Sequence, residues 1–205
     1  MKQPNEKQES TVVTACAERS IDISQISRGA LEVISELGEA GFQAYLVGGG
    51  VRDLLLDLHP KDFDIATDAH PEDVRRLFEN SRIIGRRFRI VHVYFSEGYI
   101  EVATFRAANC EDINRHGRII TDNTYGSIEE DAFRRDFTVN ALFYDSSTKQ
   151  VLDFVNGRQD INAKLLRVIG DPDLRIREDP VRMLRAVRLA TKLDFKIEQQ
   201  TETSI

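Results

Sequence analysis

The sequence contains no uninterrupted apolar run that approaches the roughly 18 residues of a membrane span, and its first residues lack the apolar core of a secretory signal. Cysteine is also scarce, since Cys16 and Cys110 lie far apart and without the spacing of a metal site. Two unpaired thiols are therefore expected, and nothing in the chain requires an oxidising compartment. These absences predict a cytoplasmic protein with no membrane contact.

Positive charge is in the minority, because 28 Lys and Arg stand against 34 Asp and Glu and the net charge is −6. This balance argues against a protein that coats nucleic acid through its overall charge. The basic residues nevertheless gather at 86–89, at 134–135 and at Arg182, Arg185 and Arg188. Patches of this size suit a triphosphate or the end of a nucleic-acid strand. At 205 residues, the chain is long enough for one core, or for a domain and the beginning of another.

A glycine-rich segment follows the first strand-like run of the chain. Residues 44–47 favour a strand, the three glycines at 48–50 interrupt it, and a helix is predicted to begin at Val51. Glycine has no Cβ, so backbone N–H groups in this turn can approach a ligand closely. The positive end of the helix dipole favours a phosphate at the same place.

Two aspartates lie shortly after this segment. In a strand that includes residues 63–66, Asp62 and Asp64 point to one face and Phe63 points to the core. Paired carboxylates hold Mg²⁺, which prefers oxygen ligands and keeps positions for water and phosphate. Two such ions, about 4 Å apart, activate a hydroxyl and stabilise a leaving pyrophosphate. Either motif alone is usually a plain turn or a solvated strand edge, but both in this order favour metal-assisted nucleotidyl transfer.

Residues 46–53 and 60–67 together resemble the signature of class II nucleotidyltransferases in the DNA polymerase β superfamily. This group comprises CCA-adding tRNA nucleotidyltransferases and bacterial poly(A) polymerases. The resemblance runs from about residue 44 to the end of the chain. It implies an α/β (α+β) nucleotidyltransferase head with a mixed sheet of five or more strands flanked by helices, followed by the start of an all-helical neck. One departure is Asp57, where the family usually has glycine, but aspartate tolerates a left-handed backbone well.

The chain divides into three predicted parts. These are a mobile arm at residues 1–20, a catalytic head at 21–170, and the truncated beginning of a helical neck at 171–205. Ser24 is the predicted N-cap of the first helix, and the last helix is predicted to start at Arg177. The predicted apolar face of that last helix consists of Val181, Leu184 and Val187, with Ala190 as a further candidate.

Two further carboxylates are candidates for the metal site. Alternation along residues 101–106 allows Glu101 to reach the two aspartates if their strands are neighbours, with a salt-bridged strand residue as an equal alternative. Residues 134–142 closely match the family's Arg-Arg-Asp motif. This resemblance implies that Arg135 contacts the nucleotide and that Asp136 belongs to the active site. An ion pair between neighbouring residues on a helix surface is the simpler alternative.

Residues 178–182 resemble the family's Glu-Asp-x-x-Arg motif. The resemblance implies that Asp179 and Arg182 read the Watson–Crick edge of the incoming base, and that Arg185 and Arg188 hold its triphosphate. A fixed carboxylate and guanidinium match the donor and acceptor of adenine, so no nucleic-acid template is needed. A solvated basic stripe is the simpler interpretation of the three arginines.

The motifs together predict template-independent addition of AMP from ATP to an RNA 3′ end, with release of pyrophosphate and use of two Mg²⁺ ions. Segments 83–93 and 122–131 resemble those of bacterial poly(A) polymerases, while CCA addition to tRNA and a nucleotide- or RNA-binding fragment without turnover stay open as alternatives. The expected catalytic residues are Asp62, Asp64 and Asp136. The expected metal ligands are Asp62, Asp64 and Glu101, with Asp136 as the other candidate for the third carboxylate. The expected nucleotide-binding residues are Gly48, Gly49, Arg52, Arg135, Asp179, Arg182, Arg185 and Arg188.

Overall fold

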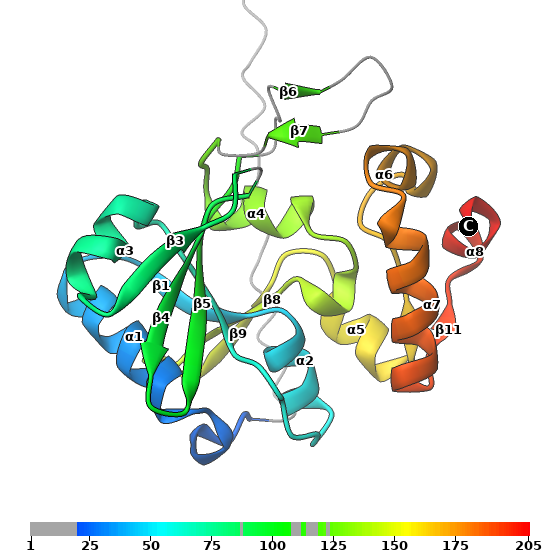
Figure 1. Ribbon diagram of the computed structural model, residues 1–205. Coiled ribbons are helices and arrows are strands. Elements are labelled where there is room, and N and C mark those ends of the chain that lie inside the picture. Colours follow the sequence, from blue (N-terminus) through cyan, green and yellow to red (C-terminus); the bar gives the residue numbers. More distant parts are fainter. Residues whose placement is uncertain (1–19, 87, 108–111, 114–118, 122–123) are drawn as a thin grey trace, which may run out of the picture.

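The structure is a computed structural model that describes residues 20–86, 88–107, 112–113, 119–121 and 124–205 (Figure 1). Both cysteines, most of the predicted N-terminal arm and parts of the segment 107–127 lie outside these residues. Among the described residues, no helix combines the length and the apolar character needed to cross a membrane.

A seven-stranded mixed sheet forms the centre of the fold, in the order β3-β4-β5-β2-β1-β8-β9 (Figure 1). Its strands are β1 (Ala44–Val47), β2 (Asp64–Thr67), β3 (Ser81–Ile84), β4 (Ile90–Phe95), β5 (Gly98–Thr104), β8 (Leu142–Asp145) and β9 (Gln150–Asp153). β2 and β5 run parallel, whereas the other neighbouring strands run antiparallel. The sheet confirms the predicted α/β head with five or more strands.

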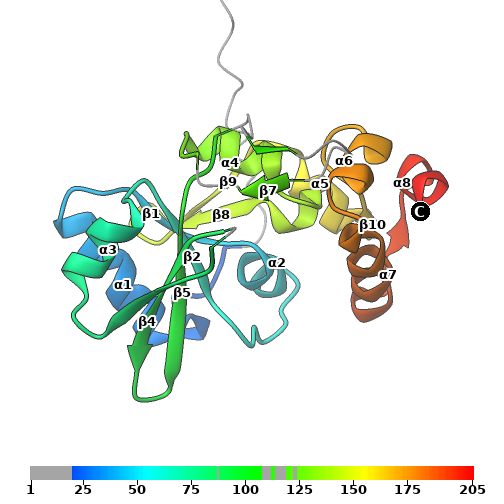
Figure 2. The same ribbon diagram turned by 45° about the horizontal axis from the view of Figure 1, so that its top comes forward.

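One face of the sheet packs against helices and holds the main core. Leu46, Ile65 and Val102 lie side by side in the register, and each is almost fully buried. α1 (Arg28–Glu39) and α3 (Pro71–Leu77) cover this face (Figures 1 and 2). Successive side chains of a strand point to opposite faces, so the residues before and after these three point to the other face of the sheet.

The opposite face of the sheet, which we call the open face, carries a smaller apolar cluster. Val47 and Phe143 lie there beside Ala132 of α4 (Ile128–Arg134). Asp64 and Glu101 also lie on this face, as register partners of the parallel strands β2 and β5. The predicted nearness of Glu101 to the aspartate pair is therefore confirmed at the level of strand pairing.

α1 begins later than the sequence suggested. The hydroxyl oxygen of Ser27 accepts a hydrogen bond from the N–H of Ala30 at 3.2 Å, so Ser27 is the N-cap. Ser24 instead lies in a short 3-10 helix, Ile23–Gln25, where its N–H donates to Asp22 at 2.9 Å. The prediction of Ser24 was wrong because two serines precede the same apolar pattern, and either could supply a capping oxygen.

The chain passes from β1 into α2 (Gly49–Leu55) through the single residue Gly48. Its φ of 77° is one that glycine adopts without strain, and it lets the helix begin two residues before Val51. At the far end of this helix Asp57 has a φ of 57°. The expectation that aspartate takes the left-handed position here is confirmed.

The segment before α4 has more regular structure than a long loop. β6 (Asp112–Ile113) and β7 (Ile119–Thr121) form a short antiparallel pair. α4 then starts with a capping box, in which Ser127 and Glu130 each accept a hydrogen bond from the other's backbone N–H. This box fixes the start of α4, and the Arg-Arg-Asp motif begins at the last residue of this helix, Arg134.

Two helices occupy the stretch in which one last helix was predicted. α6 (Pro172–Glu178) ends before Asp179, and α7 (Val181–Leu193) follows Pro180. The prediction of the apolar face was also wrong for Leu184, which is 73% exposed, and for its exposed partners Val181 and Val187. The further candidate, Ala190, does pack against the core. The side chains that α7 buries among apolar neighbours are Ala186, Leu189 and Leu193. A three-residue spacing drifts round a helix, whereas this set keeps to one side.

α7 is fixed against the head by a parallel strand pair. β10 (Leu165–Leu166), which follows α5 (Gly157–Asn162), pairs with β11 (Lys196–Ile197), which precedes α8 (Gln199–Ser204). The apolar side of α7 belongs to the same buried cluster as the sheet core. α7 therefore lies at a defined place relative to the sheet. The predicted domain boundary near residue 170 stays a prediction.

Candidate active site

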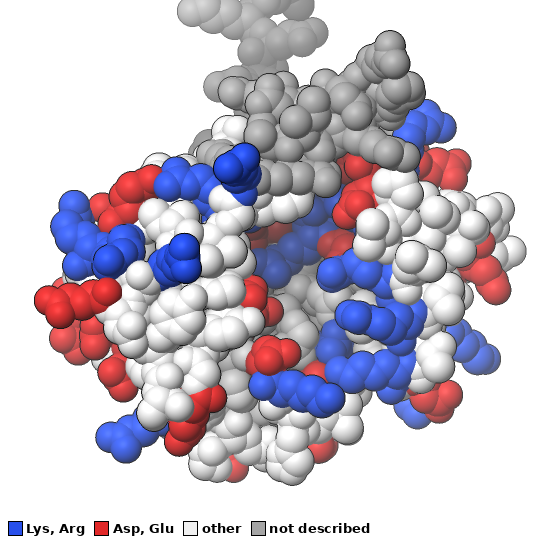
Figure 3. All heavy atoms as spheres, in the orientation of Figure 1, with Lys and Arg blue, Asp and Glu red and all other residues white. Residues whose placement is uncertain are grey.

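A cleft of about 920 Å³ includes the open face of the sheet and α7 among its walls. Figure 3 shows a hollow with basic side chains gathered along its right-hand wall and acidic side chains on the opposite side. The cleft is lined by Gly48, Gly49, Arg52, Lys61, Asp62, Asp64, Arg135, Asp136, Asn140, Asp179, Val181, Arg182, Arg185, Arg188, Leu189 and Lys192. It thus contains every site residue predicted from the sequence except Glu101, which lines an adjoining groove together with Asp62 and Asp64.

The glycine turn brings the acidic strand and the arginine motif together. The N–H of Gly48 donates to the carbonyl of Leu142 at 3.2 Å, which ties the turn to β8. A Cβ at Gly48 would lie 3.7 Å from Nη1 of Arg135 and 4.0 Å from Oδ2 of Asp64. The turn is therefore in direct reach of one cationic and one anionic side chain, and its lack of side chains keeps the space between them open.

Arg52 lines the cleft but is held from within the protein. Its side chain is buried, and it donates to Oδ1 of Asn140 and, from Nε at 2.8 Å, to Oδ1 of Asp53. Lys192 of α7 lies 3.3 Å from the other oxygen of Asp53. These contacts pin the first turn of α2 to α7 across the cleft, so Arg52 has a structural role beside any contact with a ligand.

Three carboxylates lie at the acidic wall. Asp62 is exposed just before β2, Asp64 is the first residue of β2, and Glu101 is its register partner on β5. Phe63 packs against the main core, as the sequence predicted. Burial raises the pKa of Asp64 from 3.8 to about 6, with Glu101 and Asp62 adding to the rise and Arg135 opposing it. The negative charges of Glu101 and Asp62 therefore outweigh the positive charge of Arg135 in their effect on Asp64.

The Arg-Arg-Asp motif lies at the end of α4 rather than on a helix surface. Arg135 pairs with Asp131 one turn earlier, at 2.8 Å from Nη2, and its guanidinium lies 5.1 Å from the ring centre of Phe143. Asp136 accepts hydrogen bonds from its neighbour's backbone and, at 2.7 Å, from Nε of Arg185 on α7. The simpler alternative of an ion pair between neighbouring residues is therefore wrong, because each side chain has a partner elsewhere.

The start of α7 is anchored by a network of arginines. Arg182 is buried and donates from Nη1 to the carbonyl of Arg175 and to Glu178, the latter at 3.3 Å. Arg175 in turn donates to the carbonyls of Arg134 and Arg135. The junction of α6 and α7 is thereby attached to the Arg-Arg-Asp segment. Asp179, which follows α6, faces the same cleft.

The residues that build the sheet, the glycine turn and the Arg-Arg-Asp motif match a known family. Residues 44–167 match the family model described as the poly A polymerase head domain. The chain belongs to this family. The head-domain match ends before α6, so α7 and its arginines lie beyond it.

Individual similar proteins match nearly the whole chain. Poly(A) polymerase I of Salmonella typhi is 50% identical over 196 residues, which are 92% of this chain and 42% of that protein. The CCA-adding enzyme of Lactobacillus helveticus is 42% identical over 177 residues, which are 86% of this chain and 43% of that enzyme. The crystal structure of the Bacillus stearothermophilus CCA-adding enzyme in complex with CTP has a TM-score of 0.77 and 38% identity, and the match covers 87% of this chain and 42% of that one. The chain spans about two fifths of the length of these relatives.

The cleft also contains polar side chains that the sequence analysis did not single out. Asn140 joins Arg52 to Asp136, which accepts from Asn140 Nδ2 at 3.3 Å. Lys61 and Lys192 add positive charge to the cleft lining. Lys192 could have been predicted, because it follows Arg188 by one helical turn and continues the basic series. Asn140 could not, because it lies within the Arg-Arg-Asp segment but the motif assigns it no role.

The acidic wall of the head domain offers carboxylate oxygens to a metal ion. Within the residues that the structure describes, no three His, Cys, Asp or Glu side chains converge closely enough to hold a metal ion unaided. Mg²⁺, however, is usually bound by one or two carboxylates together with water and substrate phosphates. The pair Asp62 and Asp64, with the pKa of Asp64 raised by burial and by its acidic neighbours, fits that kind of site.

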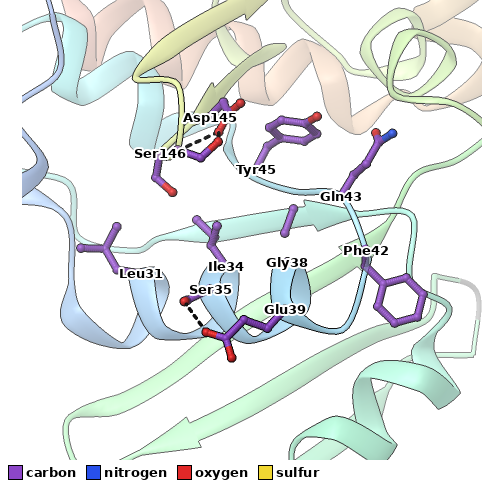
Figure 4. Close-up of a pocket in the computed structure, with 12 residues that line it drawn as sticks. Leu31, Ile34, Ser35, Gly38, Glu39, Phe42, Gln43, Tyr45, Asp145 and Ser146 are labelled. Atoms are coloured by element: carbon purple, nitrogen blue, oxygen red, sulfur yellow. Dashed lines mark hydrogen bonds between the residues drawn. The ribbon is translucent and has the colours of Figure 1, made fainter.

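A second hollow of about 540 Å³ lies between α1, the start of β1 and the β8–β9 turn (Figure 4). Its polar side chains include Glu39, Tyr45 and Asp145, and none of the described residues that line it is basic. It therefore does not suit a triphosphate, and none of the predicted site residues lines it.

Proposed function

We propose that this chain is the catalytic head of an enzyme that adds AMP from ATP to an RNA 3′ end without a nucleic-acid template. The cleft carries the proposal, because Asp62 and Asp64 line it together with Arg185 and Arg188 of α7. An acidic wall suits metal ions and a basic wall suits a triphosphate. The α-phosphate of a bound nucleotide would then lie between them.

In this reaction the 3′ oxygen of the RNA forms a bond to the α-phosphorus while the bond to the β-phosphate oxygen breaks. The hydroxyl proton passes to solvent, and pyrophosphate leaves with added negative charge. Arg185 and Arg188 would stabilise that charge. Asp136 holds Arg185 through Nε and Nη2, and fixed donors lose less entropy when a ligand binds. Arg188 has no hydrogen-bonded or ionic partner in the described part of the chain, so its donors are available for phosphate.

Asp62, Asp64 and Glu101 are the residues that would hold two Mg²⁺ ions. Bound Mg²⁺ supplies charge that favours deprotonation of the attacking hydroxyl and stabilises the leaving oxygen. A cation there would also relieve the crowding that raises the pKa of Asp64. Asp136 remains part of the proposed catalytic set, but it is paired with the permanently charged Arg185. Glu101 contacts His92 at 3.4 Å, as the salt-bridged alternative expected, and it is the register partner of Asp64, so we favour Glu101 as the third carboxylate.

Asp179 and Arg182 are proposed to select the base. Both line the cleft at the start of α7. Arg182 is held through Nη1, and in the described residues no hydrogen bond engages its Nη2. A guanidinium fixed by one nitrogen can present the other to the edge of adenine, and a wrong base would leave a buried charge without a partner.

Adenylate addition is preferred to CCA addition, because the identity to poly(A) polymerase I is 50% and that to the CCA-adding enzyme is 42%. The likeness to a CTP-bound structure keeps CCA addition as the second candidate. We place the activity in the cytoplasm, with mRNA or another RNA as acceptor.

The test incubates the chain with Mg²⁺, a short labelled RNA and each nucleoside triphosphate separately, beside a tRNA that lacks its CCA end. Long ladders with ATP alone are the expected result. Addition of two C and one A to the tRNA, followed by arrest, would favour CCA repair. Binding of ATP without extension of either RNA would contradict catalysis by this chain and favour a nucleotide-binding fragment.

A further inference from the structure

Aromatic side chains continue the open face of the sheet beyond Glu101. In the pairing of β4 with β5, His92 is the partner of Glu101 and Tyr94 is the partner of Tyr99. The rings of His92 and Tyr99 stack with their centres 4.2 Å apart and 11° between their planes, and the edge of Tyr94 meets Tyr99 at 6.1 Å. We call His92, Tyr94 and Tyr99 the aromatic platform.

The two tyrosines of the aromatic platform are open to solvent, whereas the His92 side chain is only 15% exposed. Tyr99 is 52% exposed and Tyr94 is 36% exposed, although both are large rings in contact with each other. Stacked rings with a free face can accept a further flat ring. None of the three lines the basic cleft, so the proposed contacts with the triphosphate do not account for them.

Two hollows meet at the aspartate pair. Asp62 and Asp64 line both the basic cleft and a groove of about 610 Å³, which is also lined by Glu101 and Tyr99. In phosphoryl transfer the attacking and leaving oxygens are roughly in line, on opposite sides of the phosphorus. Arg185 and Arg188 line only the cleft, so with the pyrophosphate on these arginines the groove is the place left for the attacking hydroxyl.

We propose that the aromatic platform binds the last bases of a single-stranded RNA acceptor by stacking, with Tyr99 as the exposed ring nearer to the reacting end. Tyr99 precedes Glu101 by two strand residues, or about 7 Å, which is on the order of one nucleotide. Stacking on aromatic rings accepts any base, as an acceptor of varied sequence requires. Arg82, the exposed register partner of His92, adds positive charge for the RNA backbone. This inference deepens the proposed function and rests on it for the identity of the acceptor.

The experiment measures RNA binding without turnover. Fluorescence anisotropy with a labelled short oligoadenylate, in EDTA, compares the wild-type chain with Tyr99→Leu and with Tyr99→Phe, which keeps the ring. Tyr99→Leu is expected to weaken RNA binding at least about fivefold, while Tyr99→Phe stays close to wild type. Phe133→Leu is the matched control, because Phe133 is an exposed aromatic that lines neither hollow. The affinity for ATP is expected to be the same in all four proteins.

Equal RNA affinity in wild type and Tyr99→Leu would overturn the inference, as would an equal loss in Phe133→Leu or a wild-type chain that binds no RNA. If Tyr99→Leu fails to fold by circular dichroism, Tyr94→Leu repeats the test at the neighbouring ring. RNA binding that depends on Tyr99 without any extension of RNA would uphold the platform and refute the proposed catalysis. If Tyr99→Leu extends RNA with an unchanged KM for RNA, the proposed catalysis is upheld and the platform is refuted.

Discussion

Replacement of Asp64 by asparagine is expected to stabilise the metal-free protein at neutral pH while it abolishes activity. Burial, aided by Glu101, raises the pKa of Asp64 from 3.8 to about 6. Between these values the folded protein keeps a proton that the unfolded chain has released, so the free energy of unfolding falls as the pH rises. At about 1.4 kcal/mol per pH unit, the raised pKa destabilises the folded state by about 3 kcal/mol above pH 6. Asparagine has nearly the same shape and carries no charge, so the variant avoids this loss.

The assay is urea unfolding of wild type and Asp64→Asn in EDTA, from about pH 4 to about pH 7.5. The variant's advantage in free energy of unfolding is expected to be small at about pH 4 and to level off near 3 kcal/mol once the carboxyl is ionised. Asp194→Asn is the control, because Asp194 is exposed and has a φ of 55° that asparagine also tolerates. A difference between variant and wild type that does not change with pH would refute the reasoning, since altered packing has no such pH dependence.

Two further substitutions test the basic wall. Arg188→Gln is expected to raise the Kd for ATP by roughly tenfold at unchanged stability, because it removes a charge-assisted contact. Isothermal titration would show this, with Arg177→Gln on α6 as control, and an unchanged Kd would remove Arg188 from the phosphate site. Arg182→Ala is expected to reduce the preference for ATP over the other nucleotides in extension assays, because the base loses a fixed donor. Unchanged discrimination in a folded Arg182→Ala protein would contradict its role in base selection.

The local parts of the site could be predicted because their chemistry depends on spacing along the chain. A turn that must approach a ligand needs glycine, and Gly48 does adopt a φ of 77°. The two-residue spacing of Asp62 and Asp64 suits ligands on one strand face. The position of Glu101 required one further fact, the parallel pairing of β2 with β5, which only the fold supplies.

The contacts that close the cleft could not be predicted. Arg185 and Asp136 are 49 residues apart in the sequence, and Lys192 and Asp53 are 139 apart. Contacts between residues so far apart in the sequence cannot be predicted from a local pattern. The side of α7 that faces the core was also predicted wrongly. Apolar residues lie on two sides of this helix, and the sequence alone does not show which side packs against the rest of the protein. The stacked aromatic platform likewise depends on the register of β4 with β5, since each ring alone resembles an ordinary exposed strand residue.

The central claim is that the aspartate pair organises AMP transfer in the cleft. The most direct measurement is the single-turnover rate of AMP addition from labelled ATP to a short RNA in Mg²⁺, for wild type and Asp62→Ala, with ATP affinity determined in parallel. The account predicts addition by wild type, a rate lower by several orders of magnitude in Asp62→Ala, and only a modest change in the Kd for ATP. Equal rates in the two proteins would contradict it.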